Sequence, residues 1–589
     1  MCGIFGYVGK RDAGKTIIEG LKRLEYRGYD SWGVAVVKKG EIDVVKQIGA
    51  IGDFKSLEKL PKSNIGIGHT RWATHGGVTN LNAHPHSASD KSFVVAQNGI
   101  VENYQDLKNI LQDLGHAFNS QTDTEVIVRL IEEKFKYEHN LFEAVRKAFL
   151  DLEGRNTIIV LTTEGNHIIA VRNGSPLVIG MGKDEVFFAS DTLSFADKTN
   201  KVIYINNLEM VEYIEGRVFL TNVKTGKKLN YQLATLDNKV GNITKDGFAH
   251  FMIKEIVEQK YTIKEATRYS EKELQPLLQA IKNAKNLYII GAGTASFSAG
   301  QIAFFFRKIA HIHAIELKSY EIESFKELFS RDDVMLAISQ SGETADTIDA
   351  IDCAKKKGVK IACLVNMLGS TITRISDFQY FSSSGPEVCV ASTKAFTAQI
   401  AWGFLLAMSL INKYKEAKYI ISILSKKLDK YFSDELYEQI KKLVRKIKNQ
   451  EHFFVLGKGQ NYYISLEGAL KVKEITYKHF EGFAAGELKH GVIALIDKST
   501  PVFAIVSDDE NKKDMLSAVA QVKARGAFTI GIGKEKDVLF DEFISTLDGG
   551  LADSIINVIP FQLISYFLGV ELGNNPDRPR NLAKSVTVK

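Results

Sequence analysis

The second residue of the chain is a cysteine, directly after the initiator methionine. If Met1 is removed, Cys2 carries both a thiol and a free α-amino group. Such an amine has a pKa of about 7.7–8.0 in model peptides, so near neutral pH it can take the proton from its own thiol. Cys2 is therefore a candidate nucleophile that supplies its own base. The alternative is a small apolar residue that starts a strand, with Met1 retained.

A thiolate that attacks an amide needs donors for the oxyanion and charged groups for the rest of the substrate. Asn98 and Gly99 follow an apolar run, and a side-chain amide and a backbone N–H can act as these donors. Asn-Gly is also a common hairpin turn, which leaves a second interpretation open. Arg71 can hold a carboxylate through two parallel hydrogen bonds. Asp123 can hold an ammonium group, cap a helix, or do both.

A second group of polar residues follows the apolar run that starts at Val334. Ser339 and Ser341 end this predicted strand, and a helix is expected from about Thr344. Because helix N-termini offer free N–H groups to anions, the three hydroxyls predict a phosphate site that needs no metal. A hydroxyl-capped helix without a ligand is the alternative. The matching loop of a weak internal repeat, Ser507–Glu510, carries acids that would repel phosphate, so we expect one phosphate site per chain.

The segment Gly291–Ser296, with Glu316 about twenty residues further on, imitates a dinucleotide-binding fingerprint. The third glycine of that fingerprint is missing, so we expect no nucleotide cofactor and no other cofactor. The chain also has no Cys-x-x-Cys pair and no His-rich cluster, which predicts that it holds no metal.

The elements that must position these residues differ between the two halves. Up to about residue 235, short strand-like runs between Gly and Asn turns predict packed sheets with helices outside. The expected strands are Trp32–Val37, Ile65–Thr70, Ser92–Gln97, Thr157–Thr162, His167–Arg172 and Val186–Ser190. The expected helices are Asn103–Leu114 and Thr124–Lys136.

The rest of the chain alternates strands with long helices, as is typical of a parallel-sheet α/β fold. Asn286–Gly293 and His452–Gly459 each combine an apolar strand with a Gly-x-Gly turn before a helix. Each leads to a further strand, Val334–Ile338 or Pro501–Val506. This repeat predicts two related subdomains, joined by a helical stretch over residues 396–449. The expected domains are residues 1–237, a linker at 238–250, 251–430, 431–576, and a tail at 577–589.

Composition limits the class of protein. The 589 residues are 45% hydrophobic and 25% charged, which is the balance of a soluble globular protein of several domains. A net charge of only +6, with scattered lysines, does not indicate a nucleic-acid partner. Four dispersed cysteines favour a reducing compartment. The longest apolar run, near residues 400–411, is too short for a bilayer span and predicts a buried helix, so we expect a cytoplasmic protein with no membrane partner.

Five motifs of the first half resemble, in the same order, those of the N-terminal-nucleophile glutamine amidotransferases. They are Met1–Ile4, Tyr26–Ser31, His69–His75, Asn82–His86 and Gln97–Ile100. The resemblance implies an αββα sandwich in which Cys2 is the nucleophile and Asn98 and Gly99 form the oxyanion hole. It also implies a gate on the ammonia path at Trp72 and a glutamine pocket lined by Arg71, Thr74, His75, His84 and Asp123. Trp32 departs from the pattern, because a small residue is expected there.

The second half resembles the two doubly wound sugar isomerase (SIS) subdomains of the glutamine–fructose-6-phosphate aminotransferases. The motifs are Ser339–Asp346, Val390–Phe396, Glu467–Glu474, Gly486–Gly491 and Pro579–Val588. The resemblance implies that Lys584 forms an imine with the open sugar, Glu474 moves a proton, His490 opens the ring and Lys471 assists. It implies a sugar-phosphate pocket lined by Thr294, Ser296, Ser339, Gln340, Ser341, Thr344, Val390 and Ser392.

A departure over Gly293–Gly300 leaves open whether Ala295 or Ser296 takes the place of the family's second serine. In the family the histidine reaches its site from the other subunit, which implies a homodimer. Taken singly, Lys471 and Glu474 also fit an ordinary helix ion pair, His490 a turn residue, and Lys584 a solvated tail lysine.

The expected function is glutamine-dependent conversion of fructose 6-phosphate to glucosamine 6-phosphate, with ammonia from L-glutamine passed between the two sites. The first rival is another glutamine-dependent enzyme, such as a phosphoribosyl amidotransferase or an asparagine synthetase. The latter would need a Ser-Gly-Gly-x-Asp-Ser loop, which the sequence lacks. The second rival is a sugar-phosphate sensor without catalysis, although every expected catalytic side chain is present.

Overall fold

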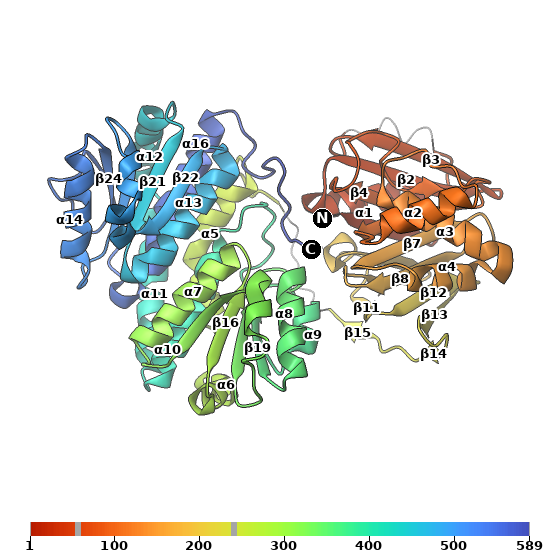
Figure 1. Cartoon of the computed structure of the whole chain (residues 1–589), viewed down its shortest axis with the longest axis horizontal. Helices are drawn as coiled ribbons and strands as arrows, with labels where there is room; N and C mark the ends of the chain where they lie inside the picture. Colours follow the sequence, from red (N-terminus) through yellow and green to blue (C-terminus); the bar gives the residue numbers. More distant parts are fainter. Residues whose placement is uncertain (1, 53–59, 237–243, 588–589) are drawn as a thin grey trace. The chain divides into compact units, whose positions relative to one another are not determined.

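The computed structural model describes residues 2–52, 60–236 and 244–587 (Figure 1). The chain divides into two compact units, which are described separately below. The first comprises the chain up to Ile243 together with the residues from Ala583 onward, and the second is Thr244–Leu582. Of the linker expected at 238–250, residues 238–243 lie outside the described part of the chain.

The first unit contains two antiparallel sheets. One has the strand order β15-β11-β9-β10-β1-β4-β2-β3 and the other β14-β13-β12-β8-β7-β6-β5. The strands of the first sheet are β1 (Gly3–Val8), β2 (Ser31–Lys38), β3 (Glu41–Ile48), β4 (Ile65–Arg71), β9 (Val178–Met181), β10 (Val186–Ala189), β11 (Lys201–Tyr204) and β15 (Ala234–Thr235). Those of the second are β5 (His86–Ser87), β6 (Phe93–Gly99), β7 (Asn156–Thr162), β8 (Ile168–Asn173), β12 (Glu209–Ile214), β13 (Arg217–Asn222) and β14 (Lys228–Leu229).

Helices cover the outer faces of both sheets and complete four layers, αββα. They are α1 (Ala13–Leu24), α2 (Tyr104–Asp113), α3 (Asp123–Glu138) and α4 (Leu141–Leu150). Side chains alternate along β1, so that Ile4 joins the core between the sheets while Phe5 joins the core under α1. Both faces of β1 are therefore covered. This architecture confirms the sandwich that the sequence predicts.

Glycines let α1 lie close to its sheet. A Cβ at Gly68 would meet Ile17 at 2.4 Å, and one at Gly20 would meet the Phe5 ring at 2.5 Å. Trp32, the unexpected large residue, is buried in the same α1 core.

The second unit contains two five-stranded parallel sheets of the same topology. Their orders are β17-β16-β18-β19-β20 and β22-β21-β23-β24-β25. The strands of the first are β16 (Leu287–Gly291), β17 (Ala314–Lys318), β18 (Val334–Ile338), β19 (Lys360–Val365) and β20 (Phe378–Phe381). Those of the second are β21 (His452–Gly457), β22 (His479–Ala484), β23 (Pro501–Val506), β24 (Phe528–Gly533) and β25 (Glu542–Ser545). The shared order confirms the two related parallel-sheet subdomains that the repeat predicts.

Helices lie on both faces of these sheets, and one apolar core extends across both subdomains. Ile289 of β16 and Val455 of β21 belong to that common core, whereas their neighbours Ile290 and Leu456 face separate outer cores. The helices are α5 (Phe251–Ala266), α6 (Glu271–Asn283), α7 (Thr294–Lys308), α8 (Ala345–Lys356), α9 (Thr371–Ile375), α10 (Lys394–Leu410), α11 (Tyr414–Tyr431), α12 (Asp434–Ile447), α13 (Tyr462–Thr476), α14 (Lys512–Lys523), α15 (Asp553–Asn557) and α16 (Ile559–Glu571).

Short 3₁₀ turns complete the chain. They are η1 (Glu25–Arg27), η3 (Thr192–Ser194), η4 (Ser319–Phe325), η5 (Gly459–Asn461), η6 (Ala485–His490), η7 (Val492–Leu495) and η8 (Gly550–Ala552). All 17 residues of α10 are buried, which confirms the buried helix expected from the apolar run. One helical segment of the described chain, Gly550–Glu571, is long and apolar enough to cross a membrane, and 89% of its most apolar stretch is buried inside the fold.

Asp577 holds the start of α5, the first helix of the second unit. Its carboxylate accepts hydrogen bonds from the backbone N–H groups of Phe251 (3.0 Å) and Met252 (2.8 Å). The N-cap residue His250 provides no side-chain cap of its own. A residue more than 300 positions away in the sequence therefore caps this helix.

We expect Asp577→Ala to destabilise the first turn of α5 by about 1 kcal/mol, because two helix N–H groups lose their acceptor. Faster amide hydrogen exchange at Phe251 and Met252 would report the loss. Asp577→Asn keeps one acceptor oxygen and serves as the control, with a smaller increase. Unchanged exchange in the alanine variant would contradict the capping role.

Candidate functional site

Cys2 lies just before β1. Gly3, the first residue of β1, pairs with Thr70 of β4. The Trp72 N–H donates a hydrogen bond to the Cys2 thiol over 3.3 Å, and the thiol contacts the Trp72 carbonyl over 3.6 Å. Burial raises the pKa of the Cys2 thiol, although the Trp72 N–H and the nearby Arg71 guanidinium oppose the shift. The pairing of β1 with β4 thus brings Cys2 beside residues about seventy positions away.

Asn98 and Gly99 end β6 and pair with Thr157 and Asn156 of β7, so the hairpin-turn interpretation is wrong. Gly99 has a φ of +136°, and a Cβ there would meet the Arg155 carbonyl at 2.1 Å. Only glycine fits this backbone, because other residues rarely adopt such angles. The Asn98 side chain is buried and donates to the Ser190 hydroxyl over 2.7 Å. Ser190 was not expected from the sequence.

Arg71 is buried at the end of β4 and directs its guanidinium at the following loop. It donates hydrogen bonds to the carbonyls of His75 (2.5 Å), Gly76 (3.3 Å) and Gly77 (3.2 Å). Burial lowers the pKa of Arg71 below its ordinary value. The guanidinium therefore fixes the loop that carries Thr74 and His75, two of the residues expected to line the glutamine pocket.

Gln121 and Asn82 hold the other side of this loop. The Gln121 side-chain oxygen accepts from the Gly77 N–H (3.2 Å) and from the Asn82 amide (3.1 Å). Asn82 in turn accepts from the Gln121 N–H (2.9 Å) and donates to the Gly77 carbonyl (2.9 Å). Neither role was expected from the sequence, because it depends on contacts between distant segments.

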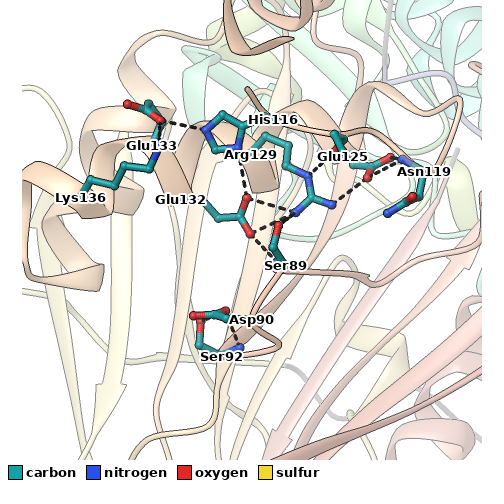
Figure 2. Close-up of polar contacts among 11 residues, drawn as sticks. Ser89, Asp90, Ser92, His116, Asn119, Glu125, Arg129, Glu132, Glu133 and Lys136 are labelled. Atoms are coloured by element: carbon teal, nitrogen blue, oxygen red, sulfur yellow. Dashed lines mark hydrogen bonds and ion pairs between the residues drawn. The ribbon is translucent and has the colours of Figure 1, made fainter. Parts of the chain in front are cut away.

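A charged network on α3 anchors the segment that carries Gln121 (Figure 2). Glu125 accepts from the N–H groups of Asn119 and Ser120 and forms an ion pair with Arg129 over 2.9 Å. Arg129 also pairs with Glu132, as Figure 2 shows. These bonds lower the pKa of Glu125 despite its partial burial. The network therefore keeps the turn before α3 in place.

Asp123 is the first residue of α3, and Thr122 is its N-cap. Its carboxylate accepts from the Val101 N–H (2.9 Å) and the Gln97 amide (3.5 Å), so it ties β6 and the following loop to the helix. Burial raises the pKa of Asp123. A buried carboxylate near Arg71 and Cys2 can receive a cation.

Three buried histidines surround the end of β6. The His69 and His84 rings stack with centroids 4.2 Å apart, and His84 and His86 lie edge to face at 5.1 Å. Burial lowers the pKa of His69 to about 3 and the pKa values of His84 and His86 well below their ordinary value. All three are therefore neutral, and none can stabilise an anion by its charge.

The remaining residues expected at the glutamine site differ in exposure. Trp72 and His75 are half-buried, and Thr74 is exposed. His75 packs against Tyr104 with ring centroids 5.0 Å apart.

In the second unit, the segment after β18 forms a tight polar loop. The Ser339 hydroxyl accepts from the Gly342 N–H (3.0 Å) and lies 3.3 Å from the Thr344 hydroxyl. Gly342 has a φ of +65°, and a Cβ there would meet the Ser370 hydroxyl at 2.1 Å. The N-cap residue Thr344 makes no side-chain cap to α8. The loop lies where the strand order reverses, which is the usual ligand site of such sheets.

Hydrogen bonds with neighbouring residues fix this loop at the N-terminus of α8. The Ser341 hydroxyl accepts from the Glu343 N–H (3.1 Å), and the Gln340 carbonyl accepts from the Asn366 N–H (2.9 Å). Glu343 turns its carboxylate towards the Thr371 N–H and hydroxyl, each 2.7 Å away. A negative charge that would oppose a phosphate is thus engaged elsewhere.

The equivalent position in the second subdomain is filled by side chains. Ser507, after β23, accepts hydrogen bonds from Asn461 (2.9 Å) and Asn557 (3.2 Å). Asn557 also donates to Asn461 over 3.0 Å. These three side chains thus form a closed hydrogen-bond group, and the single phosphate site stays a prediction.

A second polar group of this unit is a buried lysine between two carboxylates. On α13, Lys471 lies 3.4 Å from Glu467 and 2.6 Å from Glu474. Lys471 and Glu467 have no exposed side-chain surface. Thr294 links them, since it accepts from Lys471 (3.0 Å) and donates to Glu467 (3.2 Å). Glu467 lies in a motif singled out in the sequence, but no role was predicted for it.

Burial raises the pKa of Glu467 to about 8, because the Lys471 ammonium only partly offsets the loss of water. Burial opposes the charge of Lys471, yet its two carboxylate neighbours outweigh burial and raise the Lys471 pKa. The Oε2 atom of Glu467 has no hydrogen-bond partner among the described residues.

Three other expected lining residues have structural partners. The Ser296 hydroxyl donates to the Gly293 carbonyl (2.8 Å) and accepts from Lys318 (3.1 Å). Val390 is buried, and its N–H donates to the Asp577 carbonyl. Ser392 donates to Glu387 over 3.0 Å.

Two further expected catalytic residues belong to other segments of the chain. His490 ends η6 and is exposed. Lys584 belongs to the C-terminal segment that groups with the first unit. Within the described residues no cluster of His, Cys, Asp or Glu has the composition of a metal site.

The dinucleotide-like segment has a structural explanation. A Cβ at Gly291 would meet the Ala295 carbonyl at 2.5 Å, so this glycine allows the tight turn into α7. Glu316 takes the position of the acid that holds the ribose in a dinucleotide-binding fingerprint. Here it accepts a hydrogen bond from Tyr463 and forms an ion pair with Lys318 over 3.1 Å.

Comparison with known proteins matches segments in both parts of the chain to known domains. Residues 52–235 match the glutamine amidotransferase domain, and residues 280–409 and 446–543 match the SIS domain. Relatives named glutamine–fructose-6-phosphate aminotransferase (isomerizing) are 39% identical in Pyrococcus horikoshii, over 602 residues, and 40% in Aquifex aeolicus, over 600. Each alignment covers 100% of both chains.

Among solved structures, the C-terminal domain of glucosamine-fructose-6-phosphate aminotransferase from Francisella tularensis is similar, with a TM-score of 0.52 and 31% identity. It covers 57% of this chain and 100% of that one.

Glu467 makes the stability of the second unit depend on pH. Its pKa of about 8 in the folded chain exceeds the ordinary 4.5, so the stability it contributes is complete below 4.5 and is lost as pH rises through 8. Glu467→Gln keeps the neutral shape, and we expect its unfolding temperature to fall less than that of the wild type between about pH 6 and 9. The exposed Glu435→Gln should follow the wild type. Parallel curves for Glu467→Gln and the wild type would contradict the assignment.

Proposed function

The chain belongs to the glutamine–fructose-6-phosphate aminotransferase (isomerising) family, and from that premise we propose which residues carry out each half of the reaction. It converts fructose 6-phosphate and glutamine to glucosamine 6-phosphate and glutamate. The proposal rests on one observation: a single chain carries a cysteine beside a buried Arg71 and Asp123, and separately a hydroxyl-lined helix N-terminus and the pair Lys471–Glu474.

In the glutaminase half, the Cys2 thiolate attacks the side-chain carbonyl of L-glutamine, once removal of Met1 has freed its α-amine as base. The Asn98 amide and a backbone N–H at Gly99 stabilise the oxyanion. The C–N bond breaks, ammonia leaves with a proton from the amine, and water hydrolyses the thioester to glutamate. Arg71 is assigned the α-carboxylate of glutamine and Asp123 its ammonium group, because both act electrostatically on the thiol and a guanidinium and a carboxylate suit these two groups.

The walls of this pocket are assigned to Thr74, His75 and His84, and Trp72 to the ammonia path. Arg71 and the pair Asn82–Gln121 support that assignment, because they fix the loop that carries Thr74 and His75.

In the isomerase half, Ser339, Gln340, Ser341 and Thr344 bind the phosphate at the N-terminus of α8, with Thr294, Ser296, Val390 and Ser392 around the sugar. The uncapped helix start supports this assignment, because its N–H groups and dipole favour an anion. Hydrogen bonds within the fold fix the side chains of Ser296 and Ser392, so we assign them to the wall of the sugar pocket.

Lys584 forms an imine at C2 of the open sugar with loss of water, and ammonia then displaces the lysine amine from C2. Glu474 transfers the proton from C1 to C2, which gives the 2-amino aldose. Lys471 orients Glu474, since their charged groups lie 2.6 Å apart. His490 handles the ring oxygen on opening. The proposal includes no cofactor, and no nucleic acid or membrane as a partner.

We assign the enzyme to the cytoplasm and to a homodimer. None of the four cysteines forms a disulfide, as is usual in a reducing compartment. His490 is exposed on its own chain, and η7, which follows it, has the sequence Val-Ile-Ala-Leu with no buried residue. A second copy of the chain would cover this apolar turn and receive His490 in its site.

Cys2→Ala should abolish glutamine hydrolysis, because no other group of the proposed site can form the thioester. Glutamate release measures this loss, and calorimetry should show that fructose 6-phosphate still binds. Cys353→Ala, in the second unit, is the control and should remain active. The wild type, given both substrates without ATP or pyridoxal phosphate, should make glucosamine 6-phosphate. Retained hydrolysis in Cys2→Ala would refute the assignment.

Mixing two inactive variants tests the shared site. His490→Ala and Glu474→Gln should each lack synthase activity alone. If His490 acts in the partner's site, a mixed dimer holds one intact site, and random exchange should restore about a quarter of wild-type activity. Glucosamine 6-phosphate formation after subunit exchange is the measurement. No recovery, with dimer exchange shown by mass spectrometry, would place His490 in the site of its own chain.

A further inference from the structure

The orientation of the Asn98 amide is set by two side chains that the proposed reaction does not use. The amide nitrogen donates to the Ser190 hydroxyl over 2.7 Å, and the amide oxygen lies 3.1 Å from the His69 Nε2 atom. All three residues are buried, with exposed fractions of 3% or less. A side-chain amide can be turned either way, and only the direction that leaves an N–H for the substrate can stabilise an oxyanion.

The contacts of His69 determine which way the amide is turned. His69 Nε2 lies 2.9 Å from the Gln97 carbonyl oxygen and 3.1 Å from the Asn98 side-chain oxygen. Both of these atoms can only accept, so Nε2 must carry a hydrogen. His69 Nδ1 has no partner among the described residues, and burial lowers the His69 pKa to about 3, which agrees with one hydrogen, on Nε2. The neutral ring thus holds the Asn98 oxygen towards itself.

Ser190 connects this amide to the strand that carries the nucleophile. Its hydroxyl oxygen accepts from the Ile4 N–H over 2.8 Å as well as from Asn98. Ile4 lies in β1, two residues after Cys2. One hydroxyl oxygen therefore fixes the distance between β1 and the end of β6.

The Asn98 nitrogen has a second hydrogen, since a primary amide carries two. Ser190 uses one, and among the described residues no other acceptor contacts this nitrogen. The second N–H is available to a ligand.

We propose that Ser190 and His69 are positioning residues for glutamine hydrolysis, which hold the Asn98 amide with one N–H aimed at the oxyanion. This inference rests on the proposed function of Asn98 as an oxyanion donor. Neither residue touches the substrate in this scheme. Their effect falls on the transition state, because the oxyanion exists only there, and not on the binding of glutamine.

The main test compares Ser190→Ala with Ser194→Ala. Ser194 is also buried, in the same segment, and its hydroxyl donates to the Asp191 carbonyl over 2.6 Å. Loss of a whole oxyanion donor costs about 10²–10³-fold in kcat, and we expect about 10–100-fold for a donor that is present but misdirected. KM for glutamine should change by less than about twofold, because the bound ground state makes no use of the donor. Ser194→Ala should keep both constants.

The rate at which iodoacetamide alkylates Cys2 separates an effect on the oxyanion from a general change in structure. A general change would alter the alkylation rate together with kcat. This substitution passes through no tetrahedral oxyanion, so it reports the thiol alone. The alkylation rate of Ser190→Ala should equal that of the wild type while its kcat is reduced. If alkylation and kcat fall together, Ser190 acts on the thiol or the fold, and the proposal is wrong. An unchanged kcat in Ser190→Ala would also refute it.

Substitutions of His69 give an independent arm. His69→Gln keeps an N–H donor near the Nε2 position and should retain kcat within about threefold, whereas His69→Leu removes the donor and should match Ser190→Ala. Equal loss in both His69 variants would contradict the orienting role. Failure of the proposed function gives a different result, since Cys2→Ala would then still hydrolyse glutamine.

Discussion

Cys2, the second residue of the chain, depends on strand pairing for its position. Terminal residues are usually poorly ordered, because nothing on one side restrains them. Here β1 pairs on both sides, with β4 and with β10, and its two faces are covered by separate cores. The Trp72 N–H then meets the Cys2 thiol, and Ser190 meets the Ile4 N–H. The glutaminase half is thus organised by the fixation of its first strand.

The second unit meets a different constraint, the cost of burying charge. Lys471 has no exposed side-chain surface, and two acidic side chains within 3.4 Å offset the cost of burying its charge. Two ionised acids and one charged lysine would leave the group with a net negative charge. The raised pKa of Glu467 removes that charge, because Glu467 keeps its proton. Glu474 is the partly exposed acid of this group.

The sequence supported the elements better than the contacts between them. Strands such as Val334–Ile338 and Pro501–Val506 were predicted with their observed bounds, since a buried parallel strand is a continuous apolar run. Helix α1 was missed, although Asp12 caps it and Lys22 and Arg23 occupy its last turn. The sequence left open whether Asn98–Gly99 forms a turn, because only the pairing of β6 with β7 excludes one. Ser190 is unpredictable from spacing, since its partners lie 92 and 186 positions away.

The internal repeat places the same strand order around two different groups of polar side chains. Both sheets reverse their strand order at the same point, and both place a serine, Ser339 or Ser507, after the central strand. In the first copy that serine bonds within its own loop and faces an uncapped helix start. In the second, Asn461 and Asn557 donate hydrogen bonds to the serine hydroxyl. The same topology therefore carries two different hydrogen-bond arrangements at its switch point.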